Sequence, residues 1–318
     1  MAKLTVLVTR SIPSVGIDLL KKYFLVEVYK GRGPIPRRVL LSKVKRCDAL
    51  LSLLTEKIDK EILDAGVRLK VVANYAVGVD NIDVEYARSK GIVVTNTPGV
   101  LEEAVAEHTF ALLFSLGRRI LEADAFVRAH KYKYWDPMLL LGTQFSGKTL
   151  GLMGLGHIGE AVAIRAHGLK MKIVYHDVVR HRDLEMKVGA RYVKSEELLR
   201  SSDFVSLHVP LLSSTRHLIS TRELSMMKRT ALLINTARGP VIDEEALVLA
   251  IKAKKIAGAA LDVFEFEPRV SRQLLSLQNV ILTPHIASGT LEAREMMADI
   301  AARNIIQVLK GKRPISLV

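Results

Sequence analysis

Short apolar runs rich in Val, Ile and Leu alternate along the chain with longer stretches in which apolar residues recur at helical spacing. This alternation is typical of parallel α/β folds, because a helical crossover must return the chain to the start of the next strand. In the first third, the expected strands are Thr5–Val8, Val26–Tyr29, Ala49–Leu53, Val71–Asn74 and Ile92–Thr95. The expected helices between them lie at residues 14–23, 36–46, 57–65 and 83–89.

A second series of the same kind follows a single long helical pattern at residues 101–129. Its expected strands are Thr149–Met153, Lys172–Tyr175, Phe204–Val209, Ala231–Asn235, Ala257–Asp262 and Val280–Leu282. A last helix is expected at Leu291–Leu309. Two strand–helix series predict an α/β fold with two doubly wound parallel-sheet (Rossmann-like) domains and a cleft between them.

Composition narrows the possible partners. The 318 residues are 49% hydrophobic and 25% charged, which is ordinary for a folded globular protein and excludes a disordered chain. A net charge of +14 raises the question of nucleic-acid binding. The basic residues are scattered, however, and no RNP-like aromatic motif accompanies them. We therefore expect no nucleic-acid partner and interpret the charge as a solvated surface that helps to collect small anions.

Hydropathy and cysteine content bear on the cellular compartment. No apolar run approaches the ~18 residues of a membrane-spanning helix, and the apolar N-terminal stretch is too short for a signal peptide. We therefore expect no membrane partner. The single cysteine, Cys47, excludes an internal disulfide, makes a zinc or other metal site unexpected, and fits a reducing cytoplasm. Scarce Gln and Asn among many Lys, Arg and Glu favour a thermophilic source.

A glycine-rich motif, Gly154-Leu155-Gly156-His157-Ile158-Gly159, follows an apolar strand and precedes a helical stretch. In this context Gly154 permits a tight turn, Gly156 lets the backbone approach a pyrophosphate, and Gly159 lets the helix pack on the strand. The phosphates would lie at the N-terminus of the helix, where free N–H groups and the positive end of the dipole favour anions. The motif therefore predicts dinucleotide binding.

An acidic residue, Asp177, ends the next expected strand, eighteen residues after Gly159. A carboxylate there accepts hydrogen bonds from the ribose hydroxyls of the adenosine and repels a 2′-phosphate, which favours NAD over NADP. The cations Arg180, His181 and Arg182 follow closely and would soften this preference.

Three charged side chains follow expected strands of the second series: Arg238 in Asn235–Pro240, Glu267 in Leu261–Pro268 and His285 in Leu282–Ser288. Open α/β sheets bind their ligands at this carboxyl edge. A guanidinium forks onto a carboxylate, and an imidazole beside a carboxylate stays protonated near neutral pH and acts as a general acid. Each residue also has a structural interpretation, and spacing alone does not join the three.

These segments, together with Asn74–Asp83 and the glycine motif, resemble the D-isomer-specific 2-hydroxyacid dehydrogenase family from end to end and in the right order. Within that family the chain looks most similar to glyoxylate/hydroxypyruvate reductases of the archaeal type. The resemblance implies a discontinuous, flavodoxin-like substrate domain at residues 1–98 plus 288–318. It implies an NAD-binding Rossmann domain at residues 99–287.

The resemblance also implies roles for individual residues. His285 would donate a proton to the keto oxygen, Glu267 would hold and charge its imidazole, and Arg238 would polarise the carbonyl and grip the carboxylate. The backbone N–H groups of Val77 and Gly78 would bind the far side of that carboxylate. The implied cofactor contacts, beyond the three glycines, are His157, Ile158, Asp177, His208, Val209, Pro210, Thr215, Thr236, Ala237, Asp262, Ala287 and Ser288.

The chain departs from the family pattern at some positions. Many glyoxylate reductases carry a second aromatic residue shortly after the one that matches Trp135, and this chain has Leu139 there. Val105 stands where related enzymes often have Thr beside the nicotinamide phosphate. Glu265 competes with Glu267 for one role; the pattern matches Glu267, so we expect Glu265 to be exposed. The resemblance places a homodimer contact in the long helix and residues 118–148.

The predicted activity is NAD(H)-dependent reduction of a small 2-keto acid to a D-2-hydroxy acid. An alternative is D-3-phosphoglycerate dehydrogenase, which shares the catalytic residues. That activity usually goes with an Arg-Ala-Gly turn where this chain has Asn74-Tyr75-Ala76, and with a C-terminal regulatory domain that the sequence to Val318 lacks. A second alternative is an NAD-sensing corepressor on the same scaffold, which the three filled catalytic positions disfavour.

Overall fold

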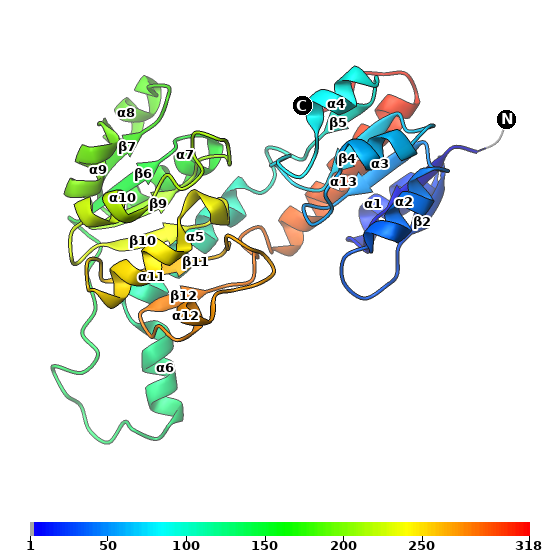
Figure 1. Ribbon diagram of the computed structural model, residues 1–318. Coiled ribbons are helices and arrows are strands. Elements are labelled where there is room, and N and C mark those ends of the chain that lie inside the picture. Colours follow the sequence, from blue (N-terminus) through cyan, green and yellow to red (C-terminus); the bar gives the residue numbers. More distant parts are fainter. Residues whose placement is uncertain (1–2) are drawn as a thin grey trace. The chain divides into compact units, whose positions relative to one another are not determined.

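The computed structural model describes residues 3–318, which form two compact units (Figure 1). Unit 1 contains the chain up to Leu101 together with Gly289–Val318, and unit 2 contains Glu102–Ser288. The resemblance places these boundaries at residues 98 and 287. The chain thus leaves unit 1 and returns to it for its last helix.

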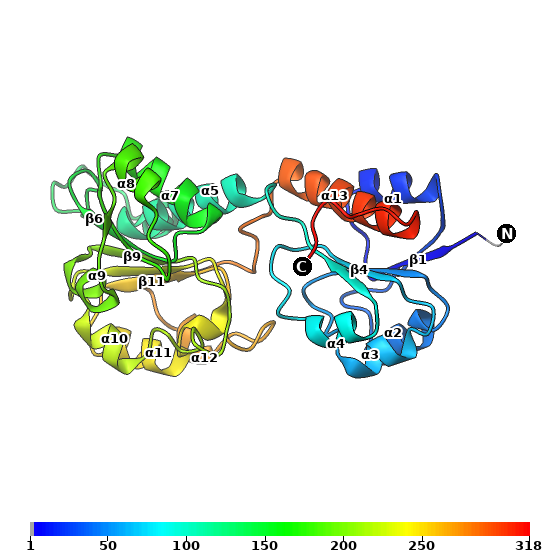
Figure 2. The ribbon, with the colours of Figure 1, turned by 90° about the horizontal axis from the view of Figure 1, so that it is seen from above.

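Unit 1 is built on a five-stranded parallel sheet with the order β2-β1-β3-β4-β5. Its strands are β1 (Thr5–Val8), β2 (Leu25–Val28), β3 (Ala49–Ser52), β4 (Val71–Asn74) and β5 (Val93–Thr95). Its helices are α1 (Ser14–Lys21), α2 (Arg37–Val44), α3 (Lys60–Ala65), α4 (Val84–Ser89) and α13 (Leu291–Leu309). Figure 2 shows α1 and α13 on one face of the sheet and α2, α3 and α4 on the other. This strand order is that of flavodoxin-like folds.

The C-terminal helix α13 is an integral layer of unit 1. Gly16 of α1 lies so close to it that a Cβ there would be 2.5 Å from the carbonyl oxygen of Ala298. The small residues Ala298, Ala301 and Ala302 are fully buried on this face of α13. The chain end then pairs with β5, where the N–H of Val318 donates to the carbonyl of Val94 at 3.1 Å.

Unit 2 is built on a seven-stranded parallel sheet with the order β12-β11-β10-β9-β6-β7-β8. Its strands are β6 (Thr149–Met153), β7 (Lys172–His176), β8 (Arg191–Tyr192), β9 (Phe204–Leu207), β10 (Leu232–Asn235), β11 (Gly258–Leu261) and β12 (Val280–Leu282). Its sheet-covering helices are α5 (Glu102–Gly117), α7 (His157–Gly168), α8 (Arg182–Val188), α9 (Ser195–Ser201), α10 (Thr221–Met226), α11 (Glu244–Lys252) and α12 (Arg272–Leu275). The first three cover one face and the other four cover the opposite face (Figure 2).

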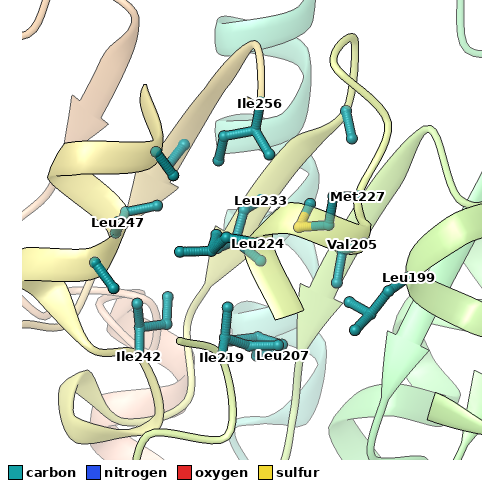
Figure 3. Close-up of a cluster of buried hydrophobic side chains, with 14 of the residues drawn as sticks. Leu199, Val205, Leu207, Ile219, Leu224, Met227, Leu233, Ile242, Leu247 and Ile256 are labelled. Atoms are coloured by element: carbon teal, nitrogen blue, oxygen red, sulfur yellow. The ribbon is translucent and has the colours of Figure 1, made fainter. Parts of the chain in front are cut away.

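The predicted fold class, α/β with two doubly wound parallel sheets, is confirmed. Buried aliphatic side chains fill the space between each sheet and its helices, because strands buried on both faces are apolar throughout. Figure 3 shows one such cluster in unit 2, where Val205 and Leu233 from the sheet meet Leu224 of α10 and Leu247 of α11. This layer fixes the strand ends from which the functional loops emerge.

The single long helix expected at residues 101–129 is wrong. The structure has two helices, α5 and α6 (Ile120–Arg128), separated by Arg119 in the left-handed conformation at φ 54°. The helical ladder stops because the carbonyl of Gly117 accepts the N–H of Thr143 at 2.7 Å instead of one from the next turn. Gly117 also packs against the ring of Phe145, leaving no room for a Cβ. Figure 1 shows α6 projecting away from the layers of unit 2.

The short edge strand β8 was not predicted, because two residues are too few to show a strand pattern. Among the helices within residues 3–318, none is long and apolar enough to cross a membrane.

Candidate active site

The carboxyl ends of the strands of unit 2 carry most of the predicted site residues. Strands β6 and β9 are neighbours in the sheet although two other strands separate them in sequence, so the strand order reverses between them. The helices that follow these two strands, α7 and α10, lie on opposite faces of the sheet (Figure 2). Open α/β sheets bind their ligands at such a topological switch point. The glycine motif follows β6 and His208 follows β9, so both lie at this point.

The glycine motif forms the turn that its spacing predicts. Gly154 has φ +90°, and a Cβ there would lie 2.7 Å from the carbonyl oxygen of His208. Gly156 is the N-cap of α7, and no atom lies within 4 Å of the position a Cβ would take, which leaves the open space a pyrophosphate requires. A Cβ at Gly159 would lie 2.5 Å from the carbonyl oxygen of Gly154. His157 and Ile158 begin α7. The turn therefore fits a dinucleotide.

Asp177 directly follows β7 and faces the glycine turn. Its carboxylate accepts the backbone N–H of Leu155 at 2.6 Å and that of Val179 at 3.2 Å. Its side chain is 17% exposed, so it lies at the surface of the turn rather than beneath it. The geometry places an acid at the end of β7, beside the glycine turn.

The cation nearest to this acid in the sequence is already paired. Arg180 donates to both carboxylate oxygens of Glu185, at 2.8 and 2.9 Å, and Tyr175 donates its hydroxyl to the same carboxylate at 2.7 Å. The bonds from Arg180 and Tyr175 lower the pKa of Glu185 to about 2, so this carboxylate is ionised at neutral pH. Glu185 thus neutralises a cation that sequence reasoning places beside the ribose.

The segment after β9 is held by hydrogen bonds of its own. The N–H of His208 donates to the carbonyl of Met153 at 2.7 Å, which ties it to β6. Ser206 and the Nε2 atom of His208 are 2.9 Å apart. Burial lowers the pKa of His208 to about 4, so the ring is neutral. Thr215 donates its hydroxyl to the carbonyl of Pro210 at 2.6 Å. Val209 lies between these residues, partly buried.

The loop after β10 carries Arg238. Asn235 shapes this loop, because its side chain donates to the carbonyl of Arg238 at 2.9 Å and accepts the N–H of Ala237 at 3.0 Å. Arg238 is half-buried and has extended backbone angles, φ −142° and ψ 140°. Thr236 is buried, with its hydroxyl 3.0 Å from that of Thr109 in α5.

The structure brings together the predicted histidine and acid. Nδ1 of His285 lies 2.9 Å from Oε2 of Glu267, although eighteen residues separate them. The other carboxylate oxygen of Glu267 accepts the N–H of Phe264 at 3.0 Å, which fixes the side chain in its own loop. The side chains of His285 and Glu267 are 25% and 30% exposed. A partly solvated imidazole held through Nδ1 presents its other nitrogen to a reactant.

A buried aspartate shapes the loop that carries His285. Asp262 is fully buried and accepts the hydroxyl of Thr283 at 2.6 Å and the N–H groups of Ile286 and Ala287 at 2.9 and 2.7 Å. Burial alone would raise the pKa of Asp262, but bonds from His108, Thr283 and the two amides lower it overall. Its carbonyl accepts the N–H of His285, whose φ is +54°. Asp262 therefore anchors Ala287 and the turn that ends unit 2 at Ser288.

The side chain of Glu265 is buried, and the expectation that it is exposed is wrong. Its side chain is 7% exposed and accepts Nε2 of His217 at 2.6 Å and Nη2 of Arg216 at 3.3 Å. The expectation fails because bonds from Arg216, His217 and the backbone N–H of Glu244 offset the cost of burying the carboxylate. His217 lies 48 residues away in sequence, so no local pattern signals this partner.

Val77 and Gly78 lie in unit 1, in the turn that follows β4. Asn96 donates to the carbonyl of Val77 at 2.9 Å, and Asn74 donates to the carbonyl of Gly78 at 2.8 Å. These bonds fix the turn through its carbonyl groups. Within residues 3–318, no three His, Cys, Asp or Glu side chains gather in a way that would hold a metal ion.

Comparison with known proteins decides the family. Residues 110–287 match the model of the D-isomer specific 2-hydroxyacid dehydrogenase, NAD binding domain. The chain belongs to the D-isomer specific 2-hydroxyacid dehydrogenase family. It is therefore an NAD-dependent oxidoreductase, as predicted.

Individual members of this 2-hydroxyacid dehydrogenase family match along the whole chain. A glyoxylate reductase of Thermococcus litoralis is 51% identical over 317 residues, which cover 98% of this chain and 96% of the relative. A crystal structure of a Thermus thermophilus protein has a TM-score of 0.94 and 43% identity, and covers 99% of this chain and all of that one. The D-lactate dehydrogenase of Aquifex aeolicus, solved with NAD and lactic acid, has a TM-score of 0.88 and 32% identity. It covers 99% of this chain and 98% of its own.

Proposed function

We propose that this dehydrogenase reduces small 2-keto acids to D-2-hydroxy acids with NADH, and that glyoxylate or hydroxypyruvate is its substrate. The observation that carries the proposal is the 2.9 Å contact between His285 and Glu267 on the sheet edge that also carries the glycine turn. The 51% identity to a glyoxylate reductase supports the choice of substrate.

The proton of the reaction comes from His285. Glu267 holds the ring through Nδ1 at 2.9 Å and places a carboxylate beside it. The opposite nitrogen donates its proton to the keto oxygen as that oxygen gains charge. Bound NADH supplies the hydride for the carbonyl carbon. In the reverse direction neutral His285 takes the proton from the hydroxyl group.

The carboxylate of the substrate is held by Arg238, whose guanidinium matches a carboxylate and the neighbouring carbonyl oxygen. This interaction orients the keto acid and stabilises negative charge on its oxygen. The backbone N–H groups of Val77 and Gly78 bind the same carboxylate, a role that rests on the family resemblance.

The nucleotide is held by residues at the carboxyl edge of the sheet of unit 2. The N-terminus of α7 at Gly156 would hold the pyrophosphate. Asp177 would bind the ribose and disfavour a 2′-phosphate by charge repulsion, while Glu185 neutralises Arg180. We propose that NADH is preferred over NADPH. The remaining proposed contacts follow the strand ends: Gly154, His157, Ile158, Gly159, His208, Val209, Pro210, Thr215, Thr236, Ala237, Asp262, Ala287 and Ser288.

Initial rates test this function directly. NADH and NADPH oxidation should be compared with glyoxylate, hydroxypyruvate, pyruvate and phosphohydroxypyruvate as acceptors. The proposal expects the highest kcat/KM with NADH and either glyoxylate or hydroxypyruvate. A preference for phosphohydroxypyruvate would assign D-3-phosphoglycerate dehydrogenase instead. Absence of oxidation with every keto acid would contradict the proposed reaction.

The proposed assembly is a homodimer formed through α6 and the segment after it. This arm exposes large apolar side chains, with Tyr134 at 74%, Trp135 at 76% and Met138 at 71% exposure. Apolar patches of this kind mark protein–protein contacts. Sedimentation equilibrium should show a dimer for the wild type and a monomer for Trp135→Glu combined with Met138→Glu. A monomeric wild type would contradict the assembly.

We also place the enzyme in the cytoplasm. Burial raises the pKa of the Cys47 thiol to about 12, so this thiol is unreactive toward oxidants at neutral pH. A chain with one buried thiol fits a reducing compartment. Cell fractionation checks this assignment, and recovery of the protein in a membrane fraction would contradict it.

A further inference from the structure

Two buried glutamates join the loop of Arg238 to the loop of Glu267. Oε2 of Glu265 accepts the backbone N–H of Glu244 at 3.3 Å, and in return Oε1 of Glu244 accepts the backbone N–H of Glu265. The side chain of Glu265 is 7% exposed, and Glu244 is 5% exposed. The two residues therefore form a reciprocal pair of carboxylate–amide bonds, which we call the glutamate clasp.

The clasp lies between two catalytic segments. Glu244 begins α11, a few residues after Arg238, while Glu265 precedes Glu267 by two residues. Between the two segments the backbones touch, because a Cβ at Gly239 would lie 1.9 Å from the carbonyl of Phe264. The N–H of Phe264 in turn holds the carboxylate of Glu267. Movement of either segment would break this contact.

A third segment completes the arrangement. His217 reaches Glu265 at 2.6 Å through Nε2, and its own N–H donates to the carbonyl of Pro240 at 2.8 Å. Ile219 and Ile242, which follow in the two segments, form a parallel bridge and are buried in the core of Figure 3. The segment of His217 therefore spans the loops of Arg238 and Glu265 and supplies a hydrogen-bond donor for the buried carboxylate.

The catalytic chemistry makes no use of these two buried carboxylates. Burial raises the pKa of Glu244, and the nearby charges of Glu265 and Glu267 act in the same direction. Two carboxylates placed close together are costly, because each charge disfavours the other. Their bonds to specific amides do what apolar contacts cannot, which is to set the relative position of two loops.

We propose that Glu244 and Glu265 are positioning residues that hold Arg238 and Glu267 in the geometry that the reaction requires. The proposal rests on the roles given to Arg238, Glu267 and His285 above. Misplacement of reacting groups by about 1 Å costs on the order of 10²-fold in rate. A looser Glu267 stabilises the charged imidazole of His285 less, and a displaced Arg238 grips the keto acid less well.

The test compares Glu244→Ala, Glu265→Ala and the double variant with the wild type. Each single variant should lower kcat/KM for the keto acid by ~10- to 100-fold, with the Kd for NADH from fluorescence titration unchanged. The alkaline limb of the kcat/KM profile should move to lower pH, because the imidazolium is held less firmly. The double variant should be no worse than either single variant, since both break one clasp.

Conservative and control variants separate positioning from stability. Glu265→Gln and Glu244→Gln keep an oxygen that accepts the partner's N–H, so they should recover most of the activity. Asp203 makes a comparable carboxylate–amide bond, because it accepts the backbone N–H of Thr149 at 2.9 Å where β9 and β6 begin, at the edge of the sheet opposite the catalytic loops. Asp203→Ala should lower the melting temperature without a shift in the pH profile.

The outcomes distinguish two failures. If the wild type reduces no keto acid, the proposed function fails. If the wild type is active and the Ala variants show an unmoved pH profile, additive losses or no rescue by Gln, the clasp is only structural and the proposal is overturned.

Discussion

The nucleotide turn and the catalytic loops lie along the same edge of one sheet, but the sequence encodes them differently. The turn occupies six consecutive residues, and each glycine answers a local requirement, as the φ of +90° at Gly154 shows. The catalytic loops take Arg238, Glu267 and His285 from three separate strand ends. A local motif can be inferred from spacing, whereas a distributed site exists only once β10, β11 and β12 are neighbours in the sheet.

The largest expected effect separates these two regions. His285→Ala removes the proton donor and should lower turnover by ~10²–10⁴. The glycine turn is untouched, so the Kd for NADH measured by fluorescence titration should be retained. The matched control is His167→Ala, which removes a ring at the C-terminal end of α7 and should leave turnover nearly unchanged. Wild-type turnover in His285→Ala would remove this residue from the mechanism.

A second substitution, Gly154→Ala, disturbs the glycine turn and leaves the catalytic loops unchanged in sequence. Gly154→Ala places a Cβ 2.7 Å from the carbonyl oxygen of His208 at a φ of +90°. Backbone strain and this clash should lower the free energy of unfolding by about 3 kcal/mol. Gly168 ends the helix of the same motif, and a Cβ there meets nothing within 4 Å. Urea denaturation should show at most a small change for Gly168→Ala. Equal stability of the two variants would contradict the strained turn.

The third effect concerns the acid that follows the turn. Asp177→Ser removes the negative charge facing the ribose and should raise the ratio of kcat/KM for NADPH to that for NADH by about 10²-fold. Asp183→Ser, in the following helix, is the control and should leave the ratio unchanged. A wild type that already prefers NADPH would refute the role given to Asp177.

These comparisons also show what the sequence can predict. Strands such as β1, β4, β6 and β12 have the predicted bounds, because a buried strand is a short apolar run between turn residues. The break at Arg119 was missed, since it depends on Thr143 taking the carbonyl of Gly117. A backbone hydrogen bond between residues so far apart in sequence leaves no periodic signal. The helical pattern therefore continued through the break.

The pairing of His285 with Glu267 was expected only through the family resemblance, and the expectation that Glu265 is exposed was wrong. Spacing cannot show that His285 lies 2.9 Å from Glu267, because that distance follows from the pairing of β11 with β12. Spacing also cannot show that the carboxylate of Glu265 bonds the ring of His217, because that contact depends on a bridge between residues 219 and 242. Long-range contacts of this kind become visible only in the folded chain.

The smallest expected effect concerns His208, which stands between the two regions. Its pKa is lowered to about 4 in the fold, below the usual value for histidine. Between about pH 6.5 and 4, His208 therefore binds a proton in the unfolded chain but stays neutral in the folded chain. The free energy of unfolding falls as pH decreases through this range. His208 should account for about 2 kcal/mol of the loss between pH 7.5 and 5. In His208→Gln, urea denaturation should show that this share has disappeared; an unchanged loss would contradict a neutral ring.

The most direct test of the central claim is a crystal structure of the enzyme with NAD⁺ and oxamate, an unreactive analogue of a 2-keto acid. The account predicts Nε2 of His285 at about 3 Å from the carbonyl oxygen of oxamate, with Nδ1 still on Glu267 and the Arg238 guanidinium on the carboxylate. An oxamate bound out of reach of His285, or an imidazole separated from Glu267, would contradict it.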